Sequence, residues 1–376
     1  MMKKICIVFC VLFLFLGTMT GQVKVGIMLP LDKGSADGTR MVEYCRGVLM
    51  AVDSLKQEGV SVDIVTLNTP ANADIKSLLD ATPTMKDRDV IFGPFYPQHV
   101  EGVASFASKN GNKVVLPYLT NTKELNTNPN LFQIAFNAVP MEQKVVENFI
   151  TLKVQKEDLQ VVIIDCNDTT DTRCPSLTAL VKSSCNEHDV KVRVTNIMQT
   201  DKNFVKAFSK KKENVVVLNS SSLQKMQEVL TRLDKMREEE PKIQCAVLGF
   251  SSWQMSSRQL YEAFCRNDVY VPSTFYCNPD DRKVKKICDG YRFWFKSEPY
   301  PVSPSYVISG FDQGYYFIKG ISKYGNAFVG SKVQQVSRQM QSPLWFNKVS
   351  VNGGYMNNAL MFIHFRTDKK TELIMQ

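Results

Sequence analysis

The side chains best placed to bind a small molecule lie in residues 89–122. This segment predicts a buried strand, a Gly-Pro turn, a helix, a second buried strand and a second polar turn. In an open parallel sheet, both turns fall at the carboxyl ends of neighbouring strands, which is the edge where such sheets bind ligands. Little in the segment suggests catalysis. We therefore expect a small-molecule binding site at this edge.

Searches for catalytic residues exclude the common enzyme classes. The chain has no GxSxG, HExxH, P-loop or GxGxxG motif, and no spacing favours a carboxylate pair or a catalytic triad. Only three histidines are present (His99, His188 and His364), and no cysteines are spaced as CxxC, so the sequence does not favour a zinc site. We expect a protein that is not an enzyme and that uses no cofactor and no metal.

The charge pattern does not indicate a nucleic-acid partner. The densest basic run, residues 210–212, is followed by Glu213 and lacks the interleaved aromatic and glycine residues of a nucleic-acid platform. Either a solvated helix end or contact with an anionic partner explains this run. Without the first 21 residues, which hold two lysines and no acids, the formal charge is 44 − 37 = +7.

Residues 1–21 predict a targeting segment. Lys3 and Lys4 precede an apolar run of twelve residues, 5–16, and small residues follow up to Gly21. This pattern is typical of a secretory signal, which we expect to be cleaved near Gln22 and to direct the protein to the periplasm. Twelve apolar residues are short for a membrane span, although an uncleaved anchor is the alternative.

Eight cysteines follow the predicted signal, and they are Cys45, Cys166, Cys174, Cys185, Cys245, Cys265, Cys277 and Cys288. An even number in an exported protein predicts disulfides, with buried free thiols as the alternative. The shortest loops favour Cys166 with Cys174 and Cys277 with Cys288. In each of these pairs, the first cysteine ends a predicted strand and the second lies in the following helix.

Strands alternate with helices about every 25–30 residues, which is typical of βαβ units and a parallel sheet with helices on both faces. Apolar runs predict strands at 23–29, 62–67, 90–92, 113–116, 131–136, 160–164, 190–195, 214–218, 244–248, 269–275 and 359–366. Apolar residues at three- and four-residue steps predict helices at 40–56, 73–82, 100–109, 141–152, 175–185, 204–209, 223–238, 282–296 and 305–323. The alternation restarts after residue 140, so we expect an α/β protein with two doubly wound parallel-sheet lobes.

The order of these elements resembles the type I periplasmic binding proteins, the branched-chain amino-acid binding family, over nearly all of the chain after residue 21. KVGIMLPL (24–31) resembles the first strand and ligand loop of the family, and residues 89–122 resemble a later strand, Gly-Pro turn, helix and strand. LFQIAFNAVPMEQ (131–143) resembles the strand that leads into the first hinge. YVISGFDQGYYFIKGI (306–321) resembles a late helix that usually carries Tyr-Asp, where this chain has Phe311-Asp312.

The resemblance implies two lobes joined by three hinge crossovers, with a ligand bound between them and closure about the hinge. It implies a first lobe of residues 22–138 plus 273–334 and a second lobe of residues 139–272 plus 335–376.

In the first lobe, the resemblance implies that ligand-binding residues lie in three loops. These residues are Leu31, Asp32, Tyr96, Gln98, Tyr118, Thr120 and Asn121. The sequence Tyr96-Pro97-Gln98 replaces the small hydroxyl that the family carries in the first turn, and Thr120 matches the hydroxyl of the second turn. Packing at the rim is the alternative role for Tyr96 and Tyr118, and a position at a helix start is the alternative for His99.

In the second lobe, the resemblance implies ligand contacts from Asn219, Ser220 and Trp253. These loops offer no carboxylate beyond Asp165 and Asp168 to pair with an ammonium group, which departs from the pattern of the amino-acid binders. Trp253 is suited to stacking on a sugar, a nucleoside or a peptide fragment. A structural anchor between the lobes is the alternative role for this side chain.

We expect a secreted solute-binding protein that holds a small polar molecule, such as an amino acid, peptide fragment, sugar or nucleoside, in a cleft between the lobes. The expected membrane partner is a permease or a sensor. The alternative is an envelope scaffold or regulator that uses the same fold to bind another protein. We expect no nucleic-acid partner, and a monomer or weak dimer.

Overall fold

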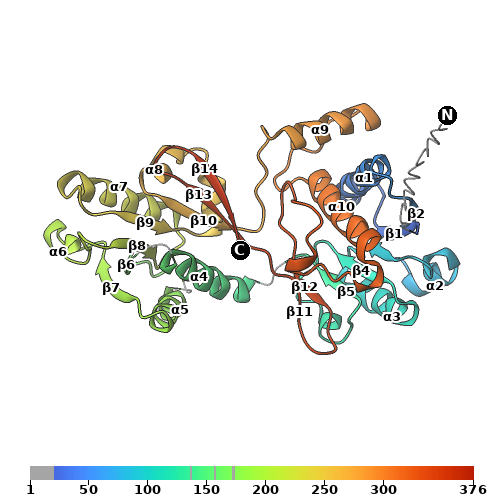
Figure 1. Ribbon diagram of the computed structural model, residues 1–376, viewed down its shortest axis with the longest axis horizontal. Coiled ribbons are helices and arrows are strands. Elements are labelled where there is room, and N and C mark those ends of the chain that lie inside the picture. The colour runs from blue at the N-terminus through green and yellow to red at the C-terminus, as the bar shows by residue number, and fades with distance from the viewer. Residues whose placement is uncertain (1–20, 136–137, 156–157, 172–173) are drawn as a thin grey trace, which may run out of the picture.

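The structure is a computed structural model that describes residues 21–135, 138–155, 158–171 and 174–376, with the backbone alone at 138–140 and 174–175. The predicted signal lies outside these residues, apart from Gly21. Within the described residues, the strands form two seven-stranded sheets, each in a lobe of its own (Figure 1). The expected α/β fold with two doubly wound lobes is confirmed.

The first lobe contains the sheet β11-β12-β5-β4-β3-β1-β2, in spatial order. Its strands are β1 (Val23–Leu29), β2 (Val62–Asn68), β3 (Val90–Phe92), β4 (Lys113–Leu116), β5 (Leu131–Gln133), β11 (Phe346–Lys348) and β12 (Tyr355–Asn357). All neighbours pair in parallel except the edge pair β11 and β12.

The second lobe repeats this order as β14-β13-β10-β9-β8-β6-β7. Its strands are β6 (Leu159–Asp165), β7 (Lys191–Asn196), β8 (Glu213–Leu218), β9 (Cys245–Leu248), β10 (Val269–Ser273), β13 (Met361–Phe365) and β14 (Thr371–Met375). The strands β13 and β14 are antiparallel to their neighbours, so each sheet has a parallel centre and an antiparallel edge.

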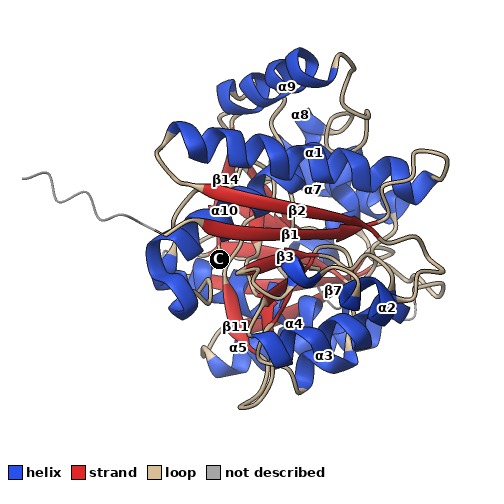
Figure 2. Cartoon of the chain, turned by 90° about the vertical axis from the view of Figure 1, so that its right-hand side faces the viewer, coloured by secondary structure: helices blue, strands red, loops and turns tan. Residues whose placement is uncertain are grey.

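Helices cover both faces of each sheet, as right-handed crossovers require. The helices of the first lobe are α1 (Ala36–Gln57), α2 (Ile75–Asp80), α3 (Val100–Asn110), α9 (Arg282–Phe295) and α10 (Tyr306–Tyr324). The helices of the second lobe are α4 (Ala138–Val154), α5 (Cys174–Glu187), α6 (Asp201–Val205), α7 (Leu223–Glu239) and α8 (Tyr261–Arg266). Figure 2 shows α1 on one side of β1 and β2, with α2 and α3 on the other side. No helix among the described residues is both long enough and apolar enough to cross a membrane.

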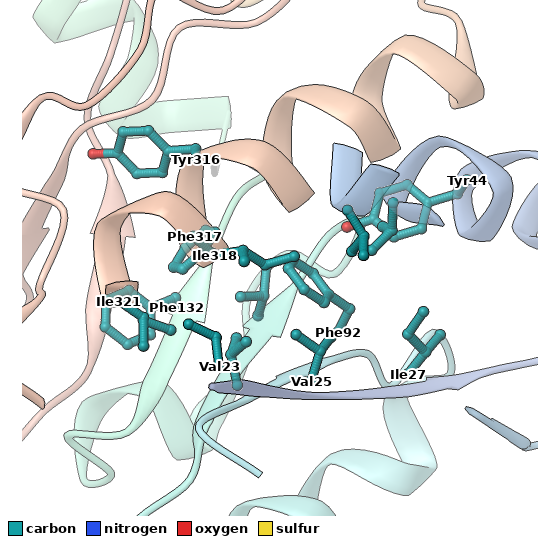
Figure 3. Packing of buried hydrophobic residues seen from close by; sticks show 14 of the residues in the cluster. Val23, Val25, Ile27, Tyr44, Phe92, Phe132, Tyr316, Phe317, Ile318 and Ile321 are labelled. Atoms are coloured by element: carbon teal, nitrogen blue, oxygen red, sulfur yellow. The ribbon is translucent and has the colours of Figure 1, made fainter. Parts of the chain in front are cut away.

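The core of the first lobe lies between its sheet and the helices α1 and α10. Phe317 of α10 stands edge-on to Phe92 of β3 and Phe132 of β5, with ring centroids 6.1 and 5.4 Å apart (Figure 3). Side chains from β1, β3, β5 and α10 therefore meet in one apolar layer. The apolar residues on the opposite face of the sheet pack under α2 and α3.

Two glycines allow α1 and α10 to cross at close range. A Cβ atom added at Gly47 would lie 2.1 Å from the carbonyl oxygen of Val307, and one added at Gly310 would lie 2.0 Å from that of Tyr44. The Tyr44 hydroxyl then donates a buried hydrogen bond of 2.7 Å to Gln313. This crossing fixes α10 on the first lobe, which the chain re-enters from β10 of the second lobe by way of α9.

The chain passes between the lobes after β5, after β10 and after β12. The first passage includes residues 136–137, which lie outside the described part of the chain. Residues 346–357, expected in the second lobe, instead form β11 and β12 at the edge of the first sheet, where Tyr355 pairs with Phe132. That part of the expected boundary is wrong, because strands of three residues carry no periodic pattern that would reveal them.

The expected disulfide between Cys277 and Cys288 is absent, since both side chains are free thiols in the structure. Burial raises the pKa of the Cys277 thiol to about 11. The other expected pair includes Cys174, whose side chain lies outside the described part of the chain. For Cys45, Cys185, Cys245 and Cys265, the alternative of buried free thiols is the one that the structure shows.

Candidate functional site

Strand order reverses once in each sheet, between β1 and β3 in the first lobe and between β6 and β8 in the second. At such a point, the crossovers leave the sheet toward opposite faces, and a crevice opens at the carboxyl ends of the two strands. The predicted residues Leu31, Asp32 and Tyr96 follow β1 and β3, and Asn219 and Ser220 follow β8. The structure therefore places these residues beside the reversal points.

Asp32 and Leu31 shape the loop that leads into α1. A carboxylate oxygen of Asp32 accepts a hydrogen bond from Gly34 N at 2.9 Å, and the N–H group of Leu31 donates to Asn68 at 2.7 Å. Ser35 then caps the helix by accepting from Gly38 N at 2.9 Å. These contacts give Asp32 a structural role in positioning the start of α1.

The first lobe presents an aromatic wall beside its reversal point. The ring of Tyr118 stands edge-on to Tyr44 at 5.7 Å, to Tyr306 at 5.7 Å and to Phe95 at 6.3 Å. Phe95 in turn contacts Tyr96 at 5.0 Å. The structure thus brings Tyr96 and Tyr118 together through Phe95, although they lie in different loops.

The hydroxyl groups of this wall are held in their neutral form. Burial, followed by the nearby carboxylate of Asp37, raises the pKa of Tyr96, whose hydroxyl donates to Asp37 at 3.4 Å. Burial raises the pKa of Tyr118 still further. The wall therefore offers aromatic faces, which suit an apolar part of a ligand, whereas the Tyr118 hydroxyl is buried and the Tyr96 hydroxyl is engaged with Asp37.

The other residues predicted in the first lobe are more scattered. Gln98 donates a hydrogen bond to the carbonyl of Ala71 at 3.0 Å. Thr120 and Asn121 are exposed on the turn after β4, where Asn121 adopts a left-handed backbone with φ of 54°. His99 is buried, and its Nε2 lies 3.3 Å from the same Ala71 carbonyl, so it supports the loop around residue 71.

In the second lobe, Asn219 and Ser220 hold neighbouring loops together. Asn219 accepts from Cys166 N at 2.9 Å and donates to Asp165 at 3.1 Å, which joins the ends of β6 and β8. Ser220 is fully buried and donates to Asp168. This hydrogen bond, with others from Thr170, lowers the pKa of Asp168 to about 2. The acids of this loop are thus engaged within the protein.

Trp253 belongs to the core of the second lobe. Its side chain is fully buried between Phe250 and Phe264, and its indole N–H points to the carbonyl of Ser221 at 3.4 Å. A Cβ atom at Gly249 would lie 2.5 Å from the indole ring, so the absence of a side chain at Gly249 leaves room for the ring. Trp253 therefore has a structural role within the core of the second lobe, rather than as an anchor between the lobes.

A cavity of about 470 Å³ opens beside Trp253, at the carboxyl ends of β8, β9 and β10. Its wall is mostly apolar and is formed by Met141, Glu142, Val145, Val146, Leu177, Val217, Ser221, Leu248, Gly249, Phe250, Ser251, Ser252, Gln254, Met255, Pro272, Ser273, Thr274, Phe275 and Leu360. An apolar pocket of this volume with a few polar groups is typical of small-molecule sites.

Residues at or next to all three crossovers line this cavity, with Leu360 contributed by the third, between β12 and β13. Met141 and Glu142 lie in the first turns of α4, directly after the first crossover, and residues 273–275 begin the second. Gln254 fixes the second crossover, because it donates to the Phe275 carbonyl at 2.9 Å and accepts from Ser273 at 2.6 Å. A ligand in the cavity would therefore touch the segments that must bend when the lobes move.

Sequence reasoning missed most of this cavity. It considered only the loops that follow strands, whereas the carboxylate of the pocket, Glu142, comes from α4. Phe250 and Ser251 lie in a loop that the sequence did single out, through Trp253. The sequence signal available for Glu142 was its position within residues 131–143, the segment that resembles the entry to the first hinge. The described residues contain no group of three or more His, Cys, Asp or Glu side chains that could hold a metal ion.

Comparisons with known proteins find likeness in structure rather than in sequence. No family model and no curated protein matches the chain. A candidate branched-chain amino acid ABC transporter protein from Rhodospirillum rubrum has 13% sequence identity and a TM-score of 0.59, with 94% of this chain and 100% of that chain covered.

A branched-chain amino acid ABC transporter periplasmic ligand-binding protein from Burkholderia xenovorans has 8% identity and a TM-score of 0.46, with 94% of each chain covered. A branched-chain amino acid transporter substrate-binding protein from Streptococcus pneumoniae, in complex with isoleucine, has 14% identity and a TM-score of 0.43, with 94% and 99% covered. Of these three structures, the one from Rhodospirillum rubrum has a TM-score above 0.5, and the fold is assigned from it. The chain has the fold of the type I periplasmic binding proteins.

Proposed function

We propose that this protein is a solute-binding protein of the cell envelope that takes up a small molecule at the cavity of its second lobe. The observation that carries the proposal is the position of that cavity, at the carboxyl edge of a parallel sheet and against the crossovers between the lobes. Occupancy at this position stabilises one arrangement of the crossovers over others, so binding becomes a signal that a membrane permease or sensor reads.

The cavity favours a ligand with an apolar body and a polar end. Its deep wall contains Val145, Val217 and Leu248, which are almost fully buried. Its rim contains the exposed Ser251 and Ser252, with the half-buried Glu142 nearby. An apolar amino acid fits this pattern better than a sugar, because a sugar would leave hydroxyls without partners against the apolar wall. The Rhodospirillum relative is named for branched-chain amino acids, which agrees with this class.

The aromatic wall of the first lobe supplies the second surface for closure. Tyr96 and Tyr118 offer aromatic faces to the same kind of ligand. Secretion to the periplasm is part of the proposal and is supported by the basic and apolar pattern of residues 1–21.

A thermal-shift screen tests this function. Leucine, isoleucine, valine, phenylalanine and small aromatic carboxylates form the expected set, with sugars and nucleosides as the comparison set. A ligand at a hundred times its Kd should stabilise the protein by about 2.7 kcal/mol. We expect a rise in Tm with the first set. A rise with sugars alone would refute the ligand class, and no rise with any compound would refute the solute-binding function.

A matched pair of methionines locates the site. Met255 lines the cavity and Met198 lies in the turn after β7, and both are 77% exposed. Met255→Asp should weaken binding about tenfold or more, because it replaces apolar contact worth about 1.5–3 kcal/mol with a charge. Met198→Asp should leave the affinity unchanged. Equal affinities for the two variants in isothermal titration calorimetry would place the ligand elsewhere.

The second candidate function is an envelope scaffold or regulator that binds a protein partner through the same fold. Exposed aromatic side chains on α9 favour attachment of the molecule to another surface. The ligand screen distinguishes the two candidate functions, because a scaffold would show no ligand-dependent rise in Tm.

A further inference from the structure

Helix α9 carries an exposed aromatic and basic surface that the proposed ligand site does not use. Phe293 is 65% exposed, Trp294 is 59% exposed and Tyr300, just after the helix, is 53% exposed. We call these three side chains, together with the cations Arg282, Lys283, Lys286 and Lys296, the α9 surface. Figures 1 and 2 place α9 on the outside of the first lobe, beyond α1. Large aromatic side chains gathered on an outer helix mark an interaction site.

The inner face of α9 is anchored, so the orientation of the outer face is fixed. Tyr291 is fully buried against α1, where its hydroxyl donates to Glu43 and accepts from Arg46. The guanidinium of Arg46 also lies 4.6 Å from the ring centroid of Phe295. Phe293 and Trp294 take no part in these contacts and are exposed. Their exposure is therefore not required by the packing of the helix.

The same helix combines these aromatic rings with positive charge that forms no ion pair, and two of these cations, Lys283 and Lys286, also border a hollow against α1 and α10. Residues 282–296 contain six cations and one acid, which gives 6 − 1 = +5. Lys285 pairs with Asp280, and Arg292 pairs with Asp289 and Glu298. Among the described residues, Arg282, Lys283, Lys286 and Lys296 form no ion pair, and Lys296 lies 4.8 Å from the ring centroid of Phe293.

Helical spacing aligns the charges with the rings. Arg282, Lys286 and Phe293 are separated by four and seven residues, and Lys283 and Trp294 by eleven, so each set lies along one line of the helix. The basic side chains occupy the first turns and the aromatic side chains occupy the last. A flat anionic surface can contact both at once.

We propose that the α9 surface docks the protein onto an anionic lipid bilayer. Basic residues with Trp and Phe on a helix that lies along the surface are typical of interfacial binding, where the cations meet lipid headgroups and the rings enter the headgroup layer. The charge complementarity favours anionic lipid over a neutral surface. The docking does not depend on the ligand cavity, which lies in the other lobe.

Vesicle sedimentation tests this docking with the chain that begins at Gln22, since every strand and core residue that the structure describes lies after residue 21. We expect binding to vesicles with about a third phosphatidylglycerol and none to pure phosphatidylcholine. Binding should weaken with salt, and the Lys283→Gln/Lys286→Gln double variant should partition about fivefold less for each charge removed. Phe293→Ser/Trp294→Ser should abolish binding at moderate salt.

A control variant in the second lobe removes the same charge. Lys202→Gln/Lys211→Gln changes two exposed lysines that form no ion pair among the described residues, and it should bind vesicles like the wild type.

Tryptophan fluorescence measures the contact directly. Trp253 is buried and Trp345 is half-buried, so a blue shift of the emission on docking should come from Trp294 and should vanish in Trp294→Phe.

Two results would overturn the proposal. One is an absence of binding to anionic vesicles at low salt, which would leave an acidic protein as the occupant of the α9 surface. The other is equal loss of binding in the second-lobe control, which would show that net charge alone acts. Thermal melting of each variant confirms that the fold is intact, since these side chains are exposed.

Discussion

The close crossing of α1 and α10 makes Gly310 the position where one added methyl group should do most damage. The Cβ atom of an alanine would lie 2.0 Å from the backbone oxygen of Tyr44, and an ordinary contact begins near 3.4 Å. The two backbones would therefore have to separate by 3.4 − 2.0 = 1.4 Å. No side-chain rotation relieves this contact, because the obstacle is a backbone atom.

Two opposing effects determine how much Gly310→Ala should change the free energy of unfolding. Overpacking of a well-packed core typically costs about 1–3 kcal/mol, and a backbone clash belongs at the upper end. Replacing glycine by alanine inside a helix contributes about 1 kcal/mol in the other direction. We expect a net loss of about 2 kcal/mol for Gly310→Ala, and a fall in Tm of about 4–8 °C. The crossing also sets the position of Tyr306, one turn earlier on α10, which belongs to the aromatic wall.

Gly290 provides the matched control for this substitution. It also lies inside a helix, but the nearest neighbour of an added Cβ atom is the terminal methyl group of Met50 at 3.1 Å, which can move. Gly290→Ala should be neutral or stabilising by up to about 1 kcal/mol. Differential scanning calorimetry of both variants measures the difference. If Gly310→Ala melts at or above the temperature of Gly290→Ala, the close crossing of the two helices is wrong.

Two further predictions concern buried side chains. Asp312 accepts hydrogen bonds from Met340 N and Gln341 N at 2.8–3.0 Å, and burial raises its pKa from 3.8 to about 7. Because the folded-state pKa is the higher one, the stability from this group is complete below about pH 4 and is lost as the pH rises through about 7. Asp312→Asn should flatten this fall in Tm between pH 4 and pH 7, and an unchanged slope would refute the assignment. Trp253→Ala should lower the free energy of unfolding, measured with denaturant, by about 3–5 kcal/mol, because the ring is fully buried. Trp294→Ala should lower it little, because that ring is exposed. Similar decreases for both variants would contradict the core position of Trp253.

Local pattern predicted most of the regular elements. The strand β1 agrees with its prediction at every residue, Val23–Leu29, because its apolar and β-branched side chains are continuous. The helix α1 begins four residues before its prediction, at Ala36, since its start is set by the Ser35 cap rather than by an apolar residue. The short strands β11 and β12 were missed, because their three residues pair only once the chain has returned to the edge of the first sheet.

The candidate site was predictable only in part. Sequence reasoning located the loops at both reversal points, since each follows a recognisable strand. It assigned ligand-binding roles to Asn219 and Ser220, whose hydrogen-bonding groups the structure shows engaged with neighbouring loops. It did not find the cavity, because a cavity depends on which side chains leave space unfilled, and no local pattern records that.

The sequence by itself determined the alternation of strands and helices, the two lobes and the absence of recognised catalytic motifs, because these depend on residue type and spacing along the chain. Tertiary structure decided where a ligand would fit. Glu142 of α4 and Phe275 of the second crossover line one cavity because two separate passages between the lobes meet at the carboxyl edge of the second sheet. It also left Phe293 and Trp294 exposed, because Ile287, Tyr291 and Phe295 make the contacts that anchor α9 on the first lobe.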